Sequence, residues 1–196
     1  MQRWSRFARL FFDIAEGVSV NSLFDSAPGF DQPLAVLKHC HDRIRKQLAT
    51  LDKLLQHLPQ HGADTDAQQA AQAVLRYFSK AAPLHHEDEE IDLLPTLSAT
   101  ASGADATLLE TLLKTILAQH QQMAMQWAAL EQQLSAIAAG TAAQLSADAI
   151  AQFAALYAEH MQIEETQIAP MAKRLFSDAQ MQTLGAAMQA RRGISA

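Results

Sequence analysis

The chain has 196 residues, of which 49% are hydrophobic and 18% charged, and its formal net charge is −6. This composition excludes an intrinsically disordered chain, and the length suits one domain with a sizeable core. The negative charge disfavours nucleic acid as a partner, because proteins that bind it present a basic face. Cys40 is the single cysteine, which excludes an internal disulfide and favours the reducing cytoplasm.

Residues 1–29 are predicted to form an N-terminal arm, and residues 30–196 the folded domain. Three arginines precede a short apolar run in the arm, but Asp13 and Glu16 interrupt that run at once. This pattern argues against an export signal, and no apolar stretch in the chain is long enough to span a bilayer. We expect the arm to pack on the domain, on a second copy in a homodimer or on another protein; a helix on a membrane surface is the alternative.

Beyond the arm, apolar residues recur at steps of three and four in four long segments, which is typical of amphipathic helices. Asp31 is the expected cap of the first helix, with Pro33 in its first turn. Pro83 should kink the second helix or break its backbone ladder locally, Pro95 and the polar stretch 98–105 should close it, and Pro170 should kink or end the fourth. The expected helices span about residues 33–61, 66–94, 105–138 and 146–170, followed by a shorter fifth at 177–191. Short polar loops between long helices predict an all-α, up-down-up-down four-helix bundle.

Two stretches of the chain fit one template, which reads a His, three residues, two Glu, four residues and a Pro. The two copies span residues 85–95 and 160–170. Helix residues four apart lie on one face, so His85 points the same way as Glu89, and His160 the same way as Glu164. Helical bundles present imidazole and carboxylate to pairs of metal ions in this way. The repetition therefore predicts half of a metal site.

Each long segment carries one His part-way along its apolar stripe, and the first and third segments supply His41 and His120. Antiparallel neighbouring helices would bring the four imidazoles to a similar level. The expected ligand set is His41, His85, Glu89, His120, His160 and Glu164. The alternative is a metal-free bundle in which these histidines are satisfied core residues.

The two inward carboxylates of this set, Glu89 and Glu164, need positive charge nearby, because burying an uncompensated carboxylate costs several kcal/mol. Lys and Arg are scarce on the stripes, which favours a bound cation. The absence of Cys from the set disfavours iron–sulfur clusters and structural zinc. Mixed imidazole and carboxylate suit non-haem iron or manganese, with zinc as a further alternative. Six groups suit two ions that Glu89 and Glu164 bridge, each ion capped by two His.

A second register is open in the first copy, because His86 and Glu90 repeat the spacing one position later. The distance from His85 to Pro95 matches the second copy, and this favours His85 with Glu89. His86 then becomes a group that contacts the ligands or lies at the rim of the site.

Other polar residues near the template have weaker assignments. Asp88, Glu90 and Glu165 are expected to be solvated or to accept hydrogen bonds that orient the ligands. Met123 and Trp127 are expected in the core, where they could also line a small apolar pocket for a gas.

These residues together resemble the hemerythrin-like, HHE cation-binding family over about residues 30–192. The resemblance rests on the two repeated stretches, on His41-Asp42-Arg43-Ile44 and on Gln119-His120 with Met123. It implies a four-helix bundle that holds a non-haem di-iron centre with oxo and carboxylate bridges. Family members bind or sense oxygen, respond to nitric oxide or iron, or take part in iron-centre repair. Where the oxygen-carrying hemerythrins have a second His on the third helix, this chain has Ala124, which implies an open position on each iron rather than simple oxygen storage.

We therefore expect a cytoplasmic protein with two non-haem iron ions that binds or senses oxygen, nitric oxide or peroxide. Manganese or zinc are possible substitutes for iron. One alternative is a di-iron oxidase or peroxidase, in which Tyr157, His86 or Glu90 would act as acid or base. The other alternative is an iron donor for iron-centre repair.

Overall fold

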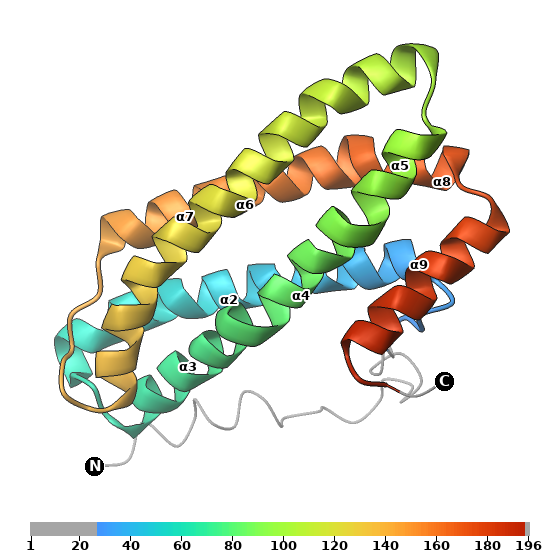
Figure 1. The fold of residues 1–196 in the computed structure, drawn as a ribbon. Coiled ribbons are helices and arrows are strands. Elements are labelled where there is room, and N and C mark those ends of the chain that lie inside the picture. The colour runs from blue at the N-terminus through green and yellow to red at the C-terminus, as the bar shows by residue number, and fades with distance from the viewer. Residues whose placement is uncertain (1–26, 195–196) are drawn as a thin grey trace, which may run out of the picture.

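The computed structural model describes residues 27–194, and every regular element in that range is a helix (Figure 1). The all-helical class is thereby confirmed for this range, whereas nearly all of the predicted arm lies outside it. The helical elements are α2 (Pro33–His61), α3 (Thr65–Arg76), η2 (Tyr77–Ala81), α4 (Ala82–Glu87), η3 (Asp88–Leu93), α5 (Leu94–Thr100), α6 (Gly103–Ala138), α7 (Ala147–Ile163), η4 (Glu164–Ile168), α8 (Ala169–Leu175) and α9 (Asp178–Arg191).

The long helices lie side by side, and α2 and α6 each pack against both α3 and α7 (Figure 1). The shorter α9 returns across the molecule and packs on η3 and α2. Among the described residues, no helix has the length and apolar character needed to cross a bilayer.

Besides Pro59, which stands inside α2, three prolines stand inside continuous helical runs of the described residues, and each of these three follows a π-helical turn that ends two residues before it. The pairs are η2 with Pro83, η3 with Pro95, and η4 with Pro170. Proline lacks a backbone N–H, and its ring clashes with the carbonyl four residues back. A π turn widens the backbone at that point, so the helix continues beyond the proline. The prediction that the second helix ends near Leu94, at Pro95, was therefore wrong, because α5 continues to Thr100. The helix does end within the polar stretch 98–105 that the sequence also indicated.

The helix starts agree with the sequence in part. Pro33 occupies the first position of α2 as predicted, but the N-cap is Gln32 rather than Asp31, and it makes no side-chain cap. Asp64 and Ser146 cap α3 and α7, where their side chains accept backbone N–H bonds. These caps fix where the long helices begin and hence the level of the residues they carry.

The core consists of two apolar clusters with a layer of buried polar residues between them. One cluster includes Ile44, Phe78 and Phe153, and the other includes Leu97 and Ile168. Along α2, α6 and the α7–α8 run, the buried polar residues fall where the chain passes from one cluster to the other. The buried polar residues of the described range are His41, His85, Asp88, Glu89, Gln119, His120, His160 and Glu164.

Candidate metal centre

All six predicted ligands lie in the buried polar layer. Their exposed fractions are 0% for His85 and His160, 1% for Glu89, 3% for His41, 4% for Glu164 and 5% for His120. They come from α2, α4, η3, α6, α7 and η4, so every long helical run contributes at least one. The structure thus brings together the whole set that the sequence predicts.

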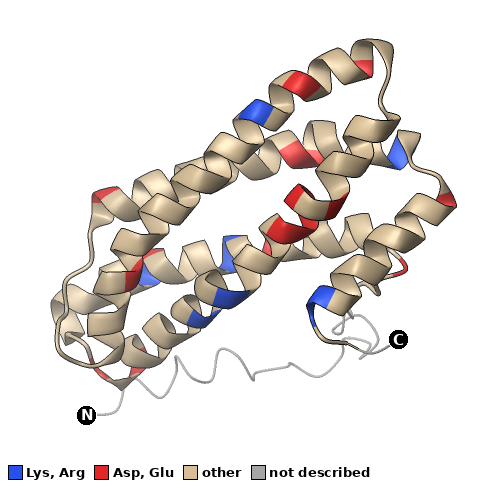
Figure 2. Cartoon of the chain, in the orientation of Figure 1, with Lys and Arg blue, Asp and Glu red and all other residues tan. Residues whose placement is uncertain are grey.

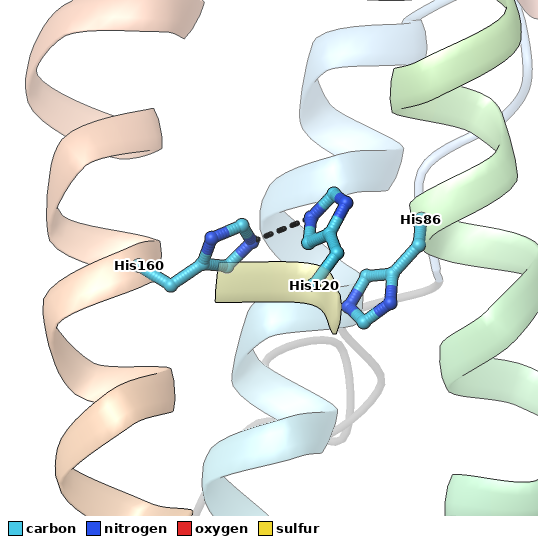
Figure 3. Close-up of side chains that lie close together, drawn as sticks. All are labelled: His86, His120 and His160. Atoms are coloured by element: carbon cyan, nitrogen blue, oxygen red, sulfur yellow. Dashed lines mark hydrogen bonds between the residues drawn. The ribbon is translucent and has the colours of Figure 1, made fainter. Parts of the chain in front are cut away.

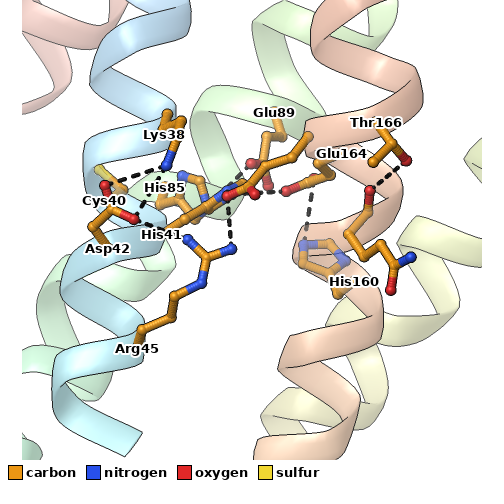
Figure 4. A network of polar contacts seen from close by, with 12 residues as sticks. Lys38, Cys40, His41, Asp42, Arg45, His85, Glu89, His160, Glu164 and Thr166 are labelled. Carbon is orange, nitrogen blue, oxygen red and sulfur yellow. Dashed lines mark hydrogen bonds and ion pairs between the residues drawn. The ribbon is translucent and has the colours of Figure 1, made fainter.

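Each carboxylate lies between two imidazoles. The Oε1 atom of Glu89 lies 3.2 Å from His85 Nε2, and its Oε2 atom lies 3.3 Å from His120 Nε2. The Oε2 atom of Glu164 lies 3.0 Å from His41 Nε2, and its Oε1 atom lies 3.3 Å from His160 Nε2 (Figure 4). Every imidazole therefore directs its Nε2 atom at a carboxylate oxygen that no other imidazole shares.

The six residues form two overlapping groups, and within each group the donor atoms lie within 4.8 Å of one another. The first position is bounded by His41 and His85, and the second position by His120 and His160. Glu89 and Glu164 belong to both groups. Two adjacent cation positions that share two carboxylates are the arrangement expected of a dinuclear centre.

Two carboxylates outside the centre orient its imidazoles. The Nδ1 atom of His41 donates to Glu165 across 2.9 Å, and the Nδ1 atom of His120 donates to Glu90 across 2.6 Å. Arg45 in turn donates to Glu165 across 2.8 Å. With its proton on Nδ1, each ring keeps the Nε2 lone pair directed inward, where a metal can use it. The expectation that Glu90 and Glu165 accept hydrogen bonds that orient the ligands is confirmed.

Several donor atoms of the centre are buried without a hydrogen-bond partner. They include Nε2 of His41, both ring nitrogens of His85, Oε2 of Glu89 and both oxygens of Glu164. Among the described residues, no Lys or Arg forms an ion pair with either carboxylate. Buried polar atoms are normally satisfied. Their convergence without partners fits a bound cation, and imidazole with carboxylate is a donor set that iron, manganese or zinc accepts.

The protonation of the centre follows from its burial. Burial and the neighbouring Glu164 raise the pKa of Glu89 well above its ordinary value. Burial acts to raise the pKa of Glu164 as well. The adjacent His160 and His41 outweigh this effect, so the pKa of Glu164 is lowered overall. Burial lowers the pKa of His85 well below its usual range and that of His160 to about 4. The lowered pKa values keep the two histidines neutral at pH 7, and the raised pKa of Glu89 means that a cation would compete with a proton for its carboxylate.

Asp88 has a place that the sequence did not predict. It is fully buried beside Glu89 and pairs with Arg191 and Arg192, while Arg191 also pairs with Asp92. Figure 2 shows this acidic stretch of η3 near the basic end of α9. The signals in the sequence were the two aspartates one turn apart and the adjacent arginines at the end of the last helix.

His86 lies beside the second position, next to two of the predicted ligands. Its ring stacks on His120 with centroids 4.0 Å apart, and it forms a further group of converging donors with His120 and His160 (Figure 3). The side chain of Glu90, its partner in the alternative register, is 43% exposed. His85 and Glu89 are therefore the pair that faces the six-donor centre. Gln119, which the sequence did not single out as a site residue, lies 3.2 Å from His160 Nδ1.

A cavity adjoins each position. One, of about 390 Å³, is lined by residues that include His41, Glu89, Glu164 and Lys38. The other, of about 410 Å³, includes His86, His120, Met123, Ala124, Trp127 and Tyr157 in its lining. Met123 and Trp127 thus line a largely apolar cavity, as the sequence suggested for a gas pocket.

Comparison with known proteins agrees with this arrangement. The model of the hemerythrin HHE cation-binding domain matches residues 32–173, which include all six buried donors. An uncharacterized protein of Haemophilus influenzae is 28% identical over 165 residues, which cover 84% of this chain and 92% of that protein. Because the family model matches most of the chain, the protein belongs to the hemerythrin HHE cation-binding family.

Proposed function

We propose that this protein is an up-down-up-down four-helix bundle that holds two non-haem iron ions and binds or senses a small ligand. The ligand would be oxygen, nitric oxide or peroxide. Glu89 and Glu164 would bridge the ions, His41 and His85 would hold the first, and His120 and His160 would hold the second. Manganese or zinc would fit the same donors. A cytoplasmic location is part of this proposal.

One observation carries the proposal, namely that the two oxygens of each glutamate face imidazoles that belong to different positions. A single ion would need only one of the two groups of donors. A protein without metal would leave two carboxylates buried together with unpartnered oxygens, which is costly. Two cations between shared carboxylates use all six residues.

The residues of the chain perform three tasks around such ions. Glu90 and Glu165 fix the tautomer and direction of His120 and His41. The apolar clusters on either side of the polar layer exclude bulk water from the centre. The two cavities offer room for a small molecule next to each position. When bound, the iron ions would supply the redox-active and Lewis-acidic sites for that molecule.

A second candidate is a di-iron oxidase or peroxidase, which the position of Tyr157 favours. This buried side chain lines the cavity beside His86 and His120. Burial raises the pKa of its hydroxyl well above the ordinary value, so it would remain protonated and able to donate. Consumption of peroxide by the iron-loaded protein, and its loss in Tyr157→Phe with iron content retained, would favour this candidate over a binding or sensing role.

The proposal is tested by iron content and absorption on anaerobically loaded protein, beside the His160→Ala/Glu164→Ala double variant. We expect about two iron ions per chain, as a dinuclear site requires, and oxo-bridge absorption bands that the double variant loses. A matched control is His57→Ala/Glu110→Ala, which removes the same two residue types away from the centre. Wild-type protein that retains no iron under these conditions would refute the di-iron proposal. Rapid loss of both ions to a weak chelator would instead indicate an iron donor.

A further inference from the structure

His86 presents a buried ring nitrogen that nothing in the described part of the chain satisfies. Its Nε2 atom has no hydrogen-bond partner. One ring nitrogen of His86 lies within 4.8 Å of ring nitrogens of both His120 and His160. The ring is nearly parallel to that of His120, with 13° between their planes, and Figure 3 shows it beside the His120–His160 pair.

The neighbourhood of His86 explains why its ring can occupy this place. Ala124 follows His120 by one helical turn, and it lines the same cavity as His86. Its methyl group leaves the space beside His120 open. A longer side chain at Ala124 would compete for the volume that the imidazole from α4 approaches.

The partners of the imidazoles distinguish His86 from three ligands of the centre. His41, His120 and His160 each have Nδ1 paired with Glu165, Glu90 or Gln119, which leaves Nε2 to face the centre. His86 has an unpartnered Nε2 next to the second position. Burying a ring nitrogen without a partner is unfavourable, and a cation within reach of it removes that cost.

We propose that His86 is a third nitrogen ligand of the second position, together with His120 and His160. The inference rests on the proposed function, because it requires a cation in the centre. The second position would then have five protein donors and the first position four. The two halves of the centre are therefore unequal, although their bridging carboxylates are shared.

The test uses Co²⁺ as the probe, since its visible absorption reports coordination number without any activity. The variant His86→Met copies the second repeat, which has Met161 at the matching position. We expect two Co²⁺ per chain in the wild type and in the variant. In the variant, the absorption bands of one ion should change. That ion should also transfer to a chelator at least about tenfold faster, since the loss of even a residue that only supports a metal ligand typically costs about 10–100-fold in metal affinity.

Two further variants separate ligation from folding. His86→Met/Ala124→His returns an imidazole to the same cavity from α6 and should restore the wild-type bands. His57→Met, away from the centre, should leave the bands and the rate unchanged.

A crystal structure of the Co²⁺-loaded protein decides the matter directly. We expect an Nε2–metal bond of about 2.0–2.1 Å at His86, as for zinc and imidazole nitrogen. Two bound ions with identical bands in wild type and His86→Met, or His86 beyond bonding distance, would overturn the inference and leave the dinuclear centre intact. Fewer than two ions in the wild type would overturn the proposed function as well.

Discussion

The two repeated stretches, residues 85–95 and 160–170, adopt the same backbone in different surroundings. In each, a π turn contains the buried glutamate that belongs to both groups of donors, and the turn ends two residues before the proline. In each, the next glutamate in the chain accepts a hydrogen bond from an imidazole of another helix. The residues that the repeats share are therefore those that build the polar layer.

Two of the differences between the repeats lie next to the shared donors. His86 corresponds to Met161, and Asp88 corresponds to Ile163. Met161 belongs to one apolar cluster and Ile163 packs against the other, whereas His86 adjoins the second position and Asp88 pairs with the arginines of α9. The second repeat thus stabilises the core, and the first adds polar contacts that make the centre asymmetric and link it to the C-terminal helix.

The largest effect is expected where the repeats are alike. Glu89→Gln and Glu164→Gln should each lower the bound iron at both positions, because each carboxylate serves both groups of donors. Iron content after gel filtration measures this loss, with Glu110→Gln, an exposed helix residue, as the control. A variant that retained one full equivalent of iron, at either position, would show that the substituted glutamate does not bridge the two ions.

The difference between Asp88 and Ile163 should appear as a difference in stability between variants of the two repeats. Asp88→Asn removes the buried partner of Arg192 and one of the partners of Arg191, and breaking a buried ion pair costs about 3–5 kcal/mol. Ile163→Val, at the matching position, removes one methyl group and should cost far less, about 0.5–1.5 kcal/mol. Denaturant unfolding of the metal-free proteins measures both values. Equal losses from the two variants would contradict the role assigned to α9.

The sequence predicted the centre better than it predicted what surrounds it. Helical periodicity and the repeated template placed all six donors on inward faces, since these depend only on local spacing. The pairing of Asp88 with Arg191 could not be predicted, because it depends on how α9 returns across the chain. The orientation of His86 likewise depends on the rotation of α4 relative to α6. The continuation past Pro95 required a π turn, which periodicity does not indicate.

Acid should weaken the metal-free protein through the buried histidines. Burial lowers the pKa of His160 to about 4 and those of His85 and His86 well below the usual range. A base with a lowered folded pKa stabilises the fold above its unfolded pKa of about 6.5, and that contribution declines as pH falls towards the folded value. The contribution of His160 alone corresponds to about 3 kcal/mol.

Unfolding midpoints between pH 7 and pH 4 measure this loss. His86→Met gives the first repeat the side chain of the second, so its stability should depend less steeply on pH than that of the wild type. The raised pKa of Glu89 acts in the opposite direction, since it costs stability as pH rises above the ordinary value, whereas the lowered pKa of Glu164 acts in the same direction as the histidines. Glu89→Gln removes the opposing contribution. A midpoint of Glu89→Gln that does not fall between pH 6.5 and pH 4 would be inconsistent with neutral buried imidazoles.

The smallest expected effect is a difference between Glu90 and Glu165, which orient His120 and His41. Loss of a group that orients a metal ligand typically costs about 10–100-fold in metal affinity. Glu165 is 26% exposed and is also held by Arg45, whereas Glu90 is 43% exposed and has His120 as its ion-pair partner. Because Arg45 restricts Glu165 before any metal binds, Glu165→Gln should lie nearer the upper end of that range and Glu90→Gln nearer the lower. Chelator competition on both variants measures the two affinities, and Arg45→Met should lower the affinity of the wild type while changing that of Glu165→Gln little. An equal effect of Arg45→Met in both backgrounds would show that Arg45 does not act through Glu165.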